Sequence, residues 1–106
     1  MAERISPEQG LERLRAGDAL FVDVRDPGSH EQARIPGAVP LNQANLEQFL
    51  ADTDRQRPPV VYCYHGHSSQ GASDYLAEQG FDAVVSLDGG FEYWRQAYPD
   101  QVDDDH

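Results

Sequence analysis

The chain has 106 residues, the size of one domain and too short to bury two separate hydrophobic cores. Nineteen acidic residues stand against eight basic ones, all of them arginine, which gives a net charge of −11 at neutral pH. Such a charge repels the phosphates of nucleic acid and of anionic lipid, so we expect neither nucleic acid nor a membrane as a partner.

The first half of the chain alternates helix signals with apolar runs. A capping-box pattern at residues 6–9 predicts a helix that ends at Gly17. The apolar run at residues 19–24 is typical of a strand buried on both faces of a sheet. Residues 36–41 predict a turn and a very short strand, and residues 45–51 carry the apolar spacing of a second helix.

The second half continues the alternation. Residues 59–63 predict a buried strand, and residues 69–79 predict a helix that Gly80 ends. Residues 81–87 predict a further strand and residues 91–97 a last helix. Strands and helices that alternate through short turns indicate an α/β domain with an open, mostly parallel sheet and helices on both faces.

The domain is expected to span residues 1–100. The acidic stretch that follows, residues 101–106, is expected to be a flexible, solvated tail whose removal leaves folding and activity unchanged. A single cysteine cannot form an intramolecular disulfide, and neither a signal peptide nor an apolar run of membrane-spanning length is found. We therefore expect a cytoplasmic protein. It is also expected to be a monomer, although no residue pattern in the sequence specifies the oligomeric state.

The segment at residues 60–69 is predicted to form strand, loop and helix, with Cys63 at the tip of the strand. Ligands of open α/β sheets bind beyond the carboxyl ends of the strands. The N–H groups and the dipole at the start of the next helix favour a thiolate. Gly66 allows the loop to curl into an anion-binding nest of N–H groups, and Ser68 and Ser69 can add hydroxyl donors.

Two interpretations of Cys63 follow from these residues alone. Free cysteine is among the most buried residue types, so Cys63 could be inert packing at the end of an apolar strand. The loop that follows favours instead a reactive cysteine beside an anion site, without naming the reaction.

Four segments, in order along nearly the whole chain, resemble the rhodanese family of sulfurtransferases. They are residues 21–26, residues 35–39, the loop after Cys63, and residues 88–94. The Cys-Tyr-His-Gly-x-Ser-Ser loop and the Asp-Gly-Gly-Phe-Glu-x-Trp segment are most similar to the short, single-domain thiosulfate sulfurtransferases of the GlpE type.

The resemblance implies a five-stranded sheet and a ping-pong reaction. Cys63 would take the outer sulfur of thiosulfate as a persulfide and pass it to cyanide in vitro, or in cells to a thiol or a dithiol, thioredoxin-like protein. No cofactor and no metal are implied. The substrate-binding loop would consist of Tyr64, His65, Gly66, His67, Ser68 and Ser69.

Asp23 and Arg25 follow the first buried strand. They could form a surface ion pair, and the resemblance implies instead that they support the active loop from behind. Phe91 and Trp94 are expected to be core residues.

The chain departs from many relatives in two places. His30 stands where an aromatic residue is common, and Ala33-Arg34 stands where Gly-His is common. The second departure is in the active loop, where many relatives carry lysine or arginine. Here only His65 and His67 could bring positive charge, so binding of a dianion would depend on backbone N–H groups.

Three other functions are alternatives to sulfur transfer from thiosulfate. Cysteine phosphatases need an arginine six positions after the cysteine, where this chain has Ser69. A zinc site of Cys63, His65 and His67 is disfavoured because alternate residues on one tight loop rarely converge on a metal. A persulfide carrier that receives sulfur from another protein would use the same cysteine and loop, and this alternative stays open.

Overall fold

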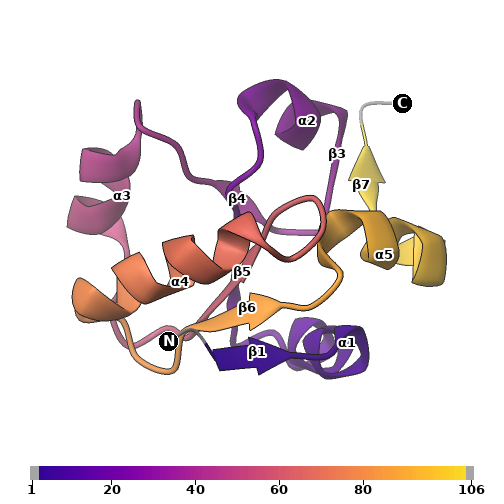
Figure 1. Ribbon diagram of the computed structural model, residues 1–106, viewed down its shortest axis with the longest axis horizontal. Coiled ribbons are helices and arrows are strands. Elements are labelled where there is room, and N and C mark those ends of the chain that lie inside the picture. Colours follow the sequence, from indigo (N-terminus) through magenta and orange to yellow (C-terminus); the bar gives the residue numbers. More distant parts are fainter. Residues whose placement is uncertain (1–2, 105–106) are drawn as a thin grey trace.

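The computed structural model describes residues 3–104. Its elements are, in chain order, β1 (Glu3–Ile5), α1 (Pro7–Ala16), β2 (Leu20–Asp23), α2 (Pro27–Gln32), β3 (Ala33–Arg34), β4 (Val39–Pro40), α3 (Leu46–Asp52), β5 (Pro59–Tyr62), α4 (Ser68–Glu78), β6 (Val85–Leu87), α5 (Gly90–Ala97), a 3-10 turn (Pro99–Gln101) and β7 (Asp103–Asp104). Figure 1 shows the helices arranged around a central sheet.

The central sheet has five strands in the order β1-β6-β5-β2-β4, and every neighbouring pair is parallel. This confirms the α/β class and the five-stranded parallel sheet. The carboxyl ends of all five strands meet at one edge, because the strands run in the same direction. Strand β5, which leads into Cys63, lies in the centre of the sheet.

Alternate residues of the central strands enter two hydrophobic clusters, one on each face of the sheet, which together form the core of the single domain. Phe21 and Tyr62 belong to the core on one face, together with side chains of α1 and α5. Val22 and Val61, which pair across the sheet, belong to the other core with side chains of α3 and α4. Burial on both faces explains why β2 and β5 appear in the sequence as unbroken apolar runs.

Several boundaries differ from the sequence expectations. The capping box of α1 is confirmed, since Ser6 Oγ accepts from Gln9 N–H and the Gln9 side chain accepts from Ser6 N–H. The strand expected at residues 81–87 contains only β6, because residues 81–84 form a turn in which Ala83 has φ +52°. Helix α2 and the edge strand β1 are too short to leave a clear periodic signal, and neither was expected.

The acidic end of the chain is paired in the structure as far as it is described. Asp103 and Asp104 form an antiparallel pair of strands with Arg34 and Ala33. The Gln101 carbonyl accepts a hydrogen bond of 2.8 Å from Trp94 Nε1, and Val102 packs against the core. Residues 101–104 are therefore attached to the domain, which differs from the solvated tail that their composition suggests, while residues 105–106 lie outside the described part.

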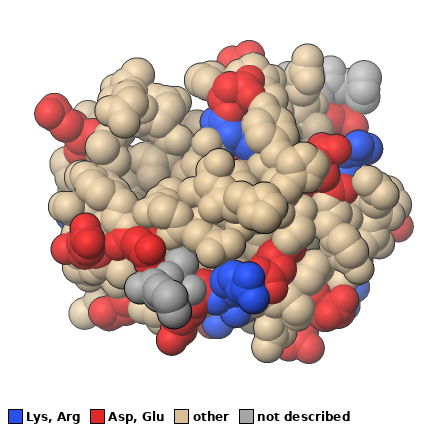
Figure 2. All heavy atoms as spheres, in the orientation of Figure 1, with Lys and Arg blue, Asp and Glu red and all other residues tan. Residues whose placement is uncertain are grey.

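Figure 2 shows how charged side chains are distributed on one face of the molecule. In Figure 2, acidic side chains lie around the rim of the face on which α4 is in front, while the middle of that face is mostly uncharged. Among residues 3–104, no helix is long and apolar enough to cross a bilayer.

Candidate active site

Cys63 lies between the end of β5 and the start of α4, at the carboxyl edge of the central sheet. Its side chain is 4% exposed. The sulfur accepts hydrogen bonds from the backbone N–H groups of Gly66 at 3.2 Å and Ser69 at 3.3 Å, and it lies 3.4 Å from Ser69 Oγ. The loop therefore curls around the sulfur and directs donors at it, as the sequence predicts.

The donors around Cys63 change its ionisation. Burial raises the pKa of a thiol, because it removes water from the charged form. The Ser69 hydroxyl and the N–H groups of Ser69, Gly66 and His65 outweigh that effect and hold the pKa of Cys63 below its ordinary value. A buried thiol with a lowered pKa is a nucleophile that needs no separate base.

The N-terminus of α5 fixes the outer side of the loop. The N–H of Phe91 donates to the Cys63 carbonyl at 2.8 Å, and the N–H of Glu92 donates to the Tyr64 carbonyl at 3.0 Å. A Cβ on Gly90 would stand only 2.5 Å from the Tyr64 carbonyl oxygen, so the close approach requires glycine here. Because these carbonyls bond outward to α5, the neighbouring N–H groups are free to turn inward toward the sulfur.

Gly66 is required by its conformation and by its surroundings. Its φ is +93°, and a Cβ would stand 3.0 Å from Gly89 N and 3.3 Å from the Leu87 carbonyl oxygen. Both neighbours are backbone atoms and cannot swing away. A side chain at this position must therefore displace the N–H group that bonds to Cys63.

We predict that Gly66→Ala lowers sulfurtransferase turnover by an order of magnitude or more while circular dichroism changes little. Gly17→Ala is the matched control, because Gly17 also has a positive φ of +78° but has no atom within 4 Å of its Cβ position. Gly17 precedes β2, at the opposite edge of the sheet from Cys63. Equal turnover in both variants would show that the curl of the loop does not contribute to the reaction.

The remaining loop residues lie on the surface. Tyr64, His65, His67 and Ser68 are all exposed. The Tyr64 hydroxyl contacts Ser29 Oγ at 2.6 Å and also donates to the Asp26 carboxylate, so it connects the loop to the start of α2. His65 and His67 are therefore accessible to solvent beside the loop. Among the described residues, no three His, Cys, Asp or Glu side chains form a group that could hold a metal ion.

Asp23 and Arg25 form a buried ion pair, not the surface pair that was one of the two expectations. Asp23 is 0% exposed and Arg25 is 7% exposed. Arg25 Nη2 donates to Asp23 at 2.7 Å and to the Ala33 carbonyl at 2.6 Å. Asp23 also accepts from Tyr62 at 3.1 Å and lies 2.9 Å from His30 Nδ1.

The surroundings of Asp23 favour its charged form. Burial opposes ionisation of the carboxyl, but the hydrogen bonds from Arg25 and His30 outweigh burial and hold the pKa of Asp23 below its ordinary value. His30, which departs from many relatives, thus supplies one of the contacts to Asp23.

The Arg25 guanidinium connects this ion pair to the active loop. It lies 4.2 Å from the centre of the Phe91 ring and 5.7 Å from the centre of the Tyr64 ring. Phe91 in turn bonds the Cys63 carbonyl through its N–H group. Arg25 therefore packs behind the loop. It contacts Tyr64, which follows Cys63 in the sequence, and Phe91, which hydrogen-bonds to the Cys63 carbonyl.

Sequence reasoning missed three contributors to this site. His30 and Tyr62 contact Asp23, and Ser86 contacts Ser69. Ser86 carried a signal as a polar residue inside an otherwise apolar strand, and His30 stood out only as a departure from many relatives, without a role. The core positions expected for Phe91 and Trp94 are confirmed, with exposed fractions of 2% and 0%.

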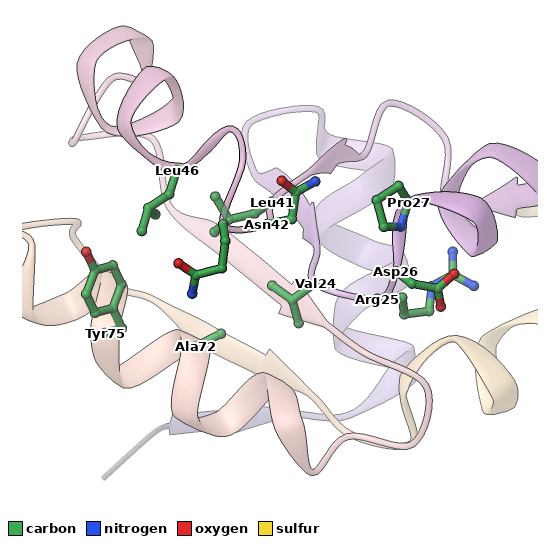
Figure 3. A pocket seen from close by; sticks show the side chains of 10 residues that line it. Val24, Arg25, Asp26, Pro27, Leu41, Asn42, Leu46, Ala72 and Tyr75 are labelled. Atoms are coloured by element: carbon green, nitrogen blue, oxygen red, sulfur yellow. The ribbon is translucent and has the colours of Figure 1, made fainter.

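A pocket of about 440 Å³ lies at the same edge of the sheet (Figure 3). Its walls come from the segments after β2 and β4, from the start of α3 and from α4, and they are mostly apolar: Val24, Pro27, Leu41, Leu46, Ala72 and Tyr75. Arg25 and Asp26 line the end away from Tyr75. The edge of the sheet thus combines a polar loop around Cys63 with an apolar hollow.

Comparison with known proteins identifies the family. The model of the rhodanese-like domain matches residues 6–97. The chain belongs to the rhodanese family. Among curated rhodanese relatives, the thiosulfate sulfurtransferase GlpE of Stutzerimonas stutzeri is 50% identical over 103 residues, covering 97% of this chain and 94% of that protein. The thiosulfate sulfurtransferase GlpE of Pseudoalteromonas translucida is 45% identical over 101 residues, covering 95% and 96%.

Solved rhodanese structures confirm the fold. The rhodanese-like domain of an Anabaena protein superimposes with a TM-score of 0.80 at 24% identity, covering 92% of this chain and 76% of that one. A rhodanese-related protein of Thermoplasma volcanium gives a TM-score of 0.77 at 22% identity, covering 91% and 93%.

Proposed function

We propose that this rhodanese is a thiosulfate sulfurtransferase that works through a persulfide on Cys63. The observation that carries the proposal is the buried Cys63 sulfur, which accepts two backbone N–H groups at 3.2 and 3.3 Å and whose pKa is held below its ordinary value. The relatives that match at 45–50% identity along almost their whole length carry that activity in their names.

The first half-reaction follows from this geometry. The Cys63 thiolate attacks the outer sulfur of thiosulfate, the bond between the two thiosulfate sulfurs breaks, and sulfite leaves with the bonding electrons. The charge balances: the thiolate carries one negative charge and thiosulfate two before the step, and afterwards the persulfide carries one and sulfite two. The N–H groups around the sulfur stabilise the charge that passes from the thiolate to the persulfide.

The second half-reaction returns the free cysteine. A nucleophilic acceptor attacks the outer sulfur of the persulfide, and the Cys63 thiolate is the leaving group. Cyanide serves as acceptor in vitro, giving thiocyanate, and a thiol or a thioredoxin-like dithiol protein serves in cells. A reactive free thiol is kept reduced in the cytoplasm, which agrees with the use of a single cysteine.

Intact-mass spectrometry tests the proposal directly. Thiosulfate alone should add the mass of one sulfur atom to the protein, and cyanide should then remove it, because the two half-reactions are separable. With one cysteine in the chain, the adduct can be assigned to Cys63. Initial rates with both substrates varied should give the parallel lines of ping-pong kinetics.

An unmodified protein after thiosulfate would contradict the proposal. If the same protein then accepted sulfur from a persulfidated donor protein, Cys63 would act as a carrier between proteins instead.

A further inference from the structure

Ser86 is a buried polar residue in the central sheet. It lies on β6 between Val85 and Leu87, pairs with Val61 across the sheet, and is 0% exposed. Its hydroxyl lies 2.7 Å from Ser69 Oγ, and in the part of the chain that the structure describes it has no other hydrogen-bond partner. A strand buried on both faces normally places an apolar side chain at such a position.

Ser69 Oγ stands between two atoms. Ser86 Oγ lies 2.7 Å away on one side and Cys63 Sγ lies 3.4 Å away on the other. The Ser69 side chain is itself 0% exposed, so water does not compete for its hydroxyl. Cys63, Ser69 and Ser86 therefore form a short hydrogen-bonded chain, which we call the serine relay.

The hydrogens of the serine relay have a preferred direction. Within residues 3–104, the Ser86 hydroxyl hydrogen-bonds to one group, Ser69 Oγ, and an unsatisfied buried donor is costly. When Ser86 donates to Ser69, the Ser69 hydrogen is excluded from that bond and is left to donate to Cys63. We propose that Ser86 is a positioning residue that commits the Ser69 hydroxyl to the Cys63 thiolate.

The hydrogen-bond donors of the serine relay can all be satisfied only when Cys63 is ionised. In the thiol form, one hydrogen on Cys63 and one on each serine, three in all, compete for the two hydrogen bonds of the relay, so one stays unsatisfied in a buried place. In the thiolate form, two hydrogens fill the two bonds. A chain of hydrogen bonds that points in one direction also polarises its last donor, which strengthens the bond to sulfur. Ser86 thus favours the thiolate without touching it.

The alkylation rate of Cys63 as a function of pH tests this inference. Iodoacetamide reacts with the thiolate, so its pH profile reports the ionisation of Cys63 whether or not the protein transfers sulfur. We expect Ser86→Ala to shift the profile to higher pH and to slow alkylation near neutral pH by about three- to tenfold. The rate at high pH, where the thiol is fully ionised, should not change.

Ser73→Ala is the matched control. Ser73 is also a buried serine, 1% exposed, but its hydroxyl donates to the Ser69 carbonyl at 2.7 Å and not to the Ser69 side chain. Its removal should leave the alkylation profile where it is. Alanine suits a buried strand position between Val85 and Leu87, so Ser86→Ala should keep the circular dichroism of the parent protein.

A double-mutant cycle separates positioning from a structural effect. Because Ser86 acts through Ser69, adding Ser86→Ala to Ser69→Ala should produce no further shift in the profile. An unshifted profile in Ser86→Ala, or shifts that add in the double variant, would overturn the inference. The inference concerns the thiolate used in the proposed function, but a failure of thiosulfate to modify Cys63 while the alkylation shift is present would contradict the proposed function alone.

Discussion

Cys63→Ser should abolish both the sulfur adduct and the turnover. A serine hydroxyl ionises far above neutral pH, and the loop has N–H and hydroxyl donors around position 63 but no base in contact with it that would take the proton. We expect turnover to fall by about three orders of magnitude or more, to the level of the uncatalysed reaction. Intact mass after thiosulfate should show the unmodified variant.

Circular dichroism and thermal unfolding provide the control for this variant. Serine differs from cysteine by one atom and can accept the same N–H groups, so the loop and the melting temperature should be preserved. Substantial turnover in a folded Cys63→Ser protein would show that sulfur transfer does not pass through this residue. A lost adduct with full turnover would indicate a reaction without a covalent intermediate.

The sequence predicts the central part of the site well because its determinants are local. The apolar strand, the cysteine at its tip, Gly66 and the start of the next helix lie within ten consecutive residues, and each has a strong local preference. The structure brings these residues together as predicted, with the N–H groups of Gly66 and Ser69 on the Cys63 sulfur.

The support of the loop was less accessible to sequence reasoning because it depends on contacts between distant segments. Asp23 and Tyr62 are separated by 39 residues, and Ser69 and Ser86 by 17. Neither contact follows from periodicity or spacing in either segment. The pairing of the acidic end with Ala33 and Arg34 is of the same kind, since its composition predicts a solvated tail and only the fold places a free strand edge beside it.

Asp23→Asn should cost the protein much of its stability. The substitution keeps the shape of the side chain but removes its charge, which leaves the 7% exposed Arg25 guanidinium without a counter-ion. Breaking a buried pair in this way costs about 3–5 kcal/mol of unfolding free energy, a large part of the stability of a typical domain. Urea unfolding at neutral pH measures the loss. A decrease below about 1 kcal/mol would contradict the prediction, because it would show that the Asp23–Arg25 pair contributes no more than an exposed ion pair does.

Arg95→Gln is the control for this experiment, and the dependence on pH identifies the group. Arg95 and Glu92 form an exposed pair with side-chain exposures of 50% and 32%, so loss of this pair should leave the unfolding free energy unchanged within error.

The pKa of Asp23 in the folded protein is below its ordinary value of 3.8. The stabilisation that the Asp23 carboxylate gives to the folded protein is therefore fully present above pH 3.8. It is lost as the pH falls through the lower pKa of the folded state. The stability difference between the parent protein and Asp23→Asn should be constant near neutral pH and shrink below about pH 4, whereas a difference that persists at low pH would show that the loss does not come from this charge.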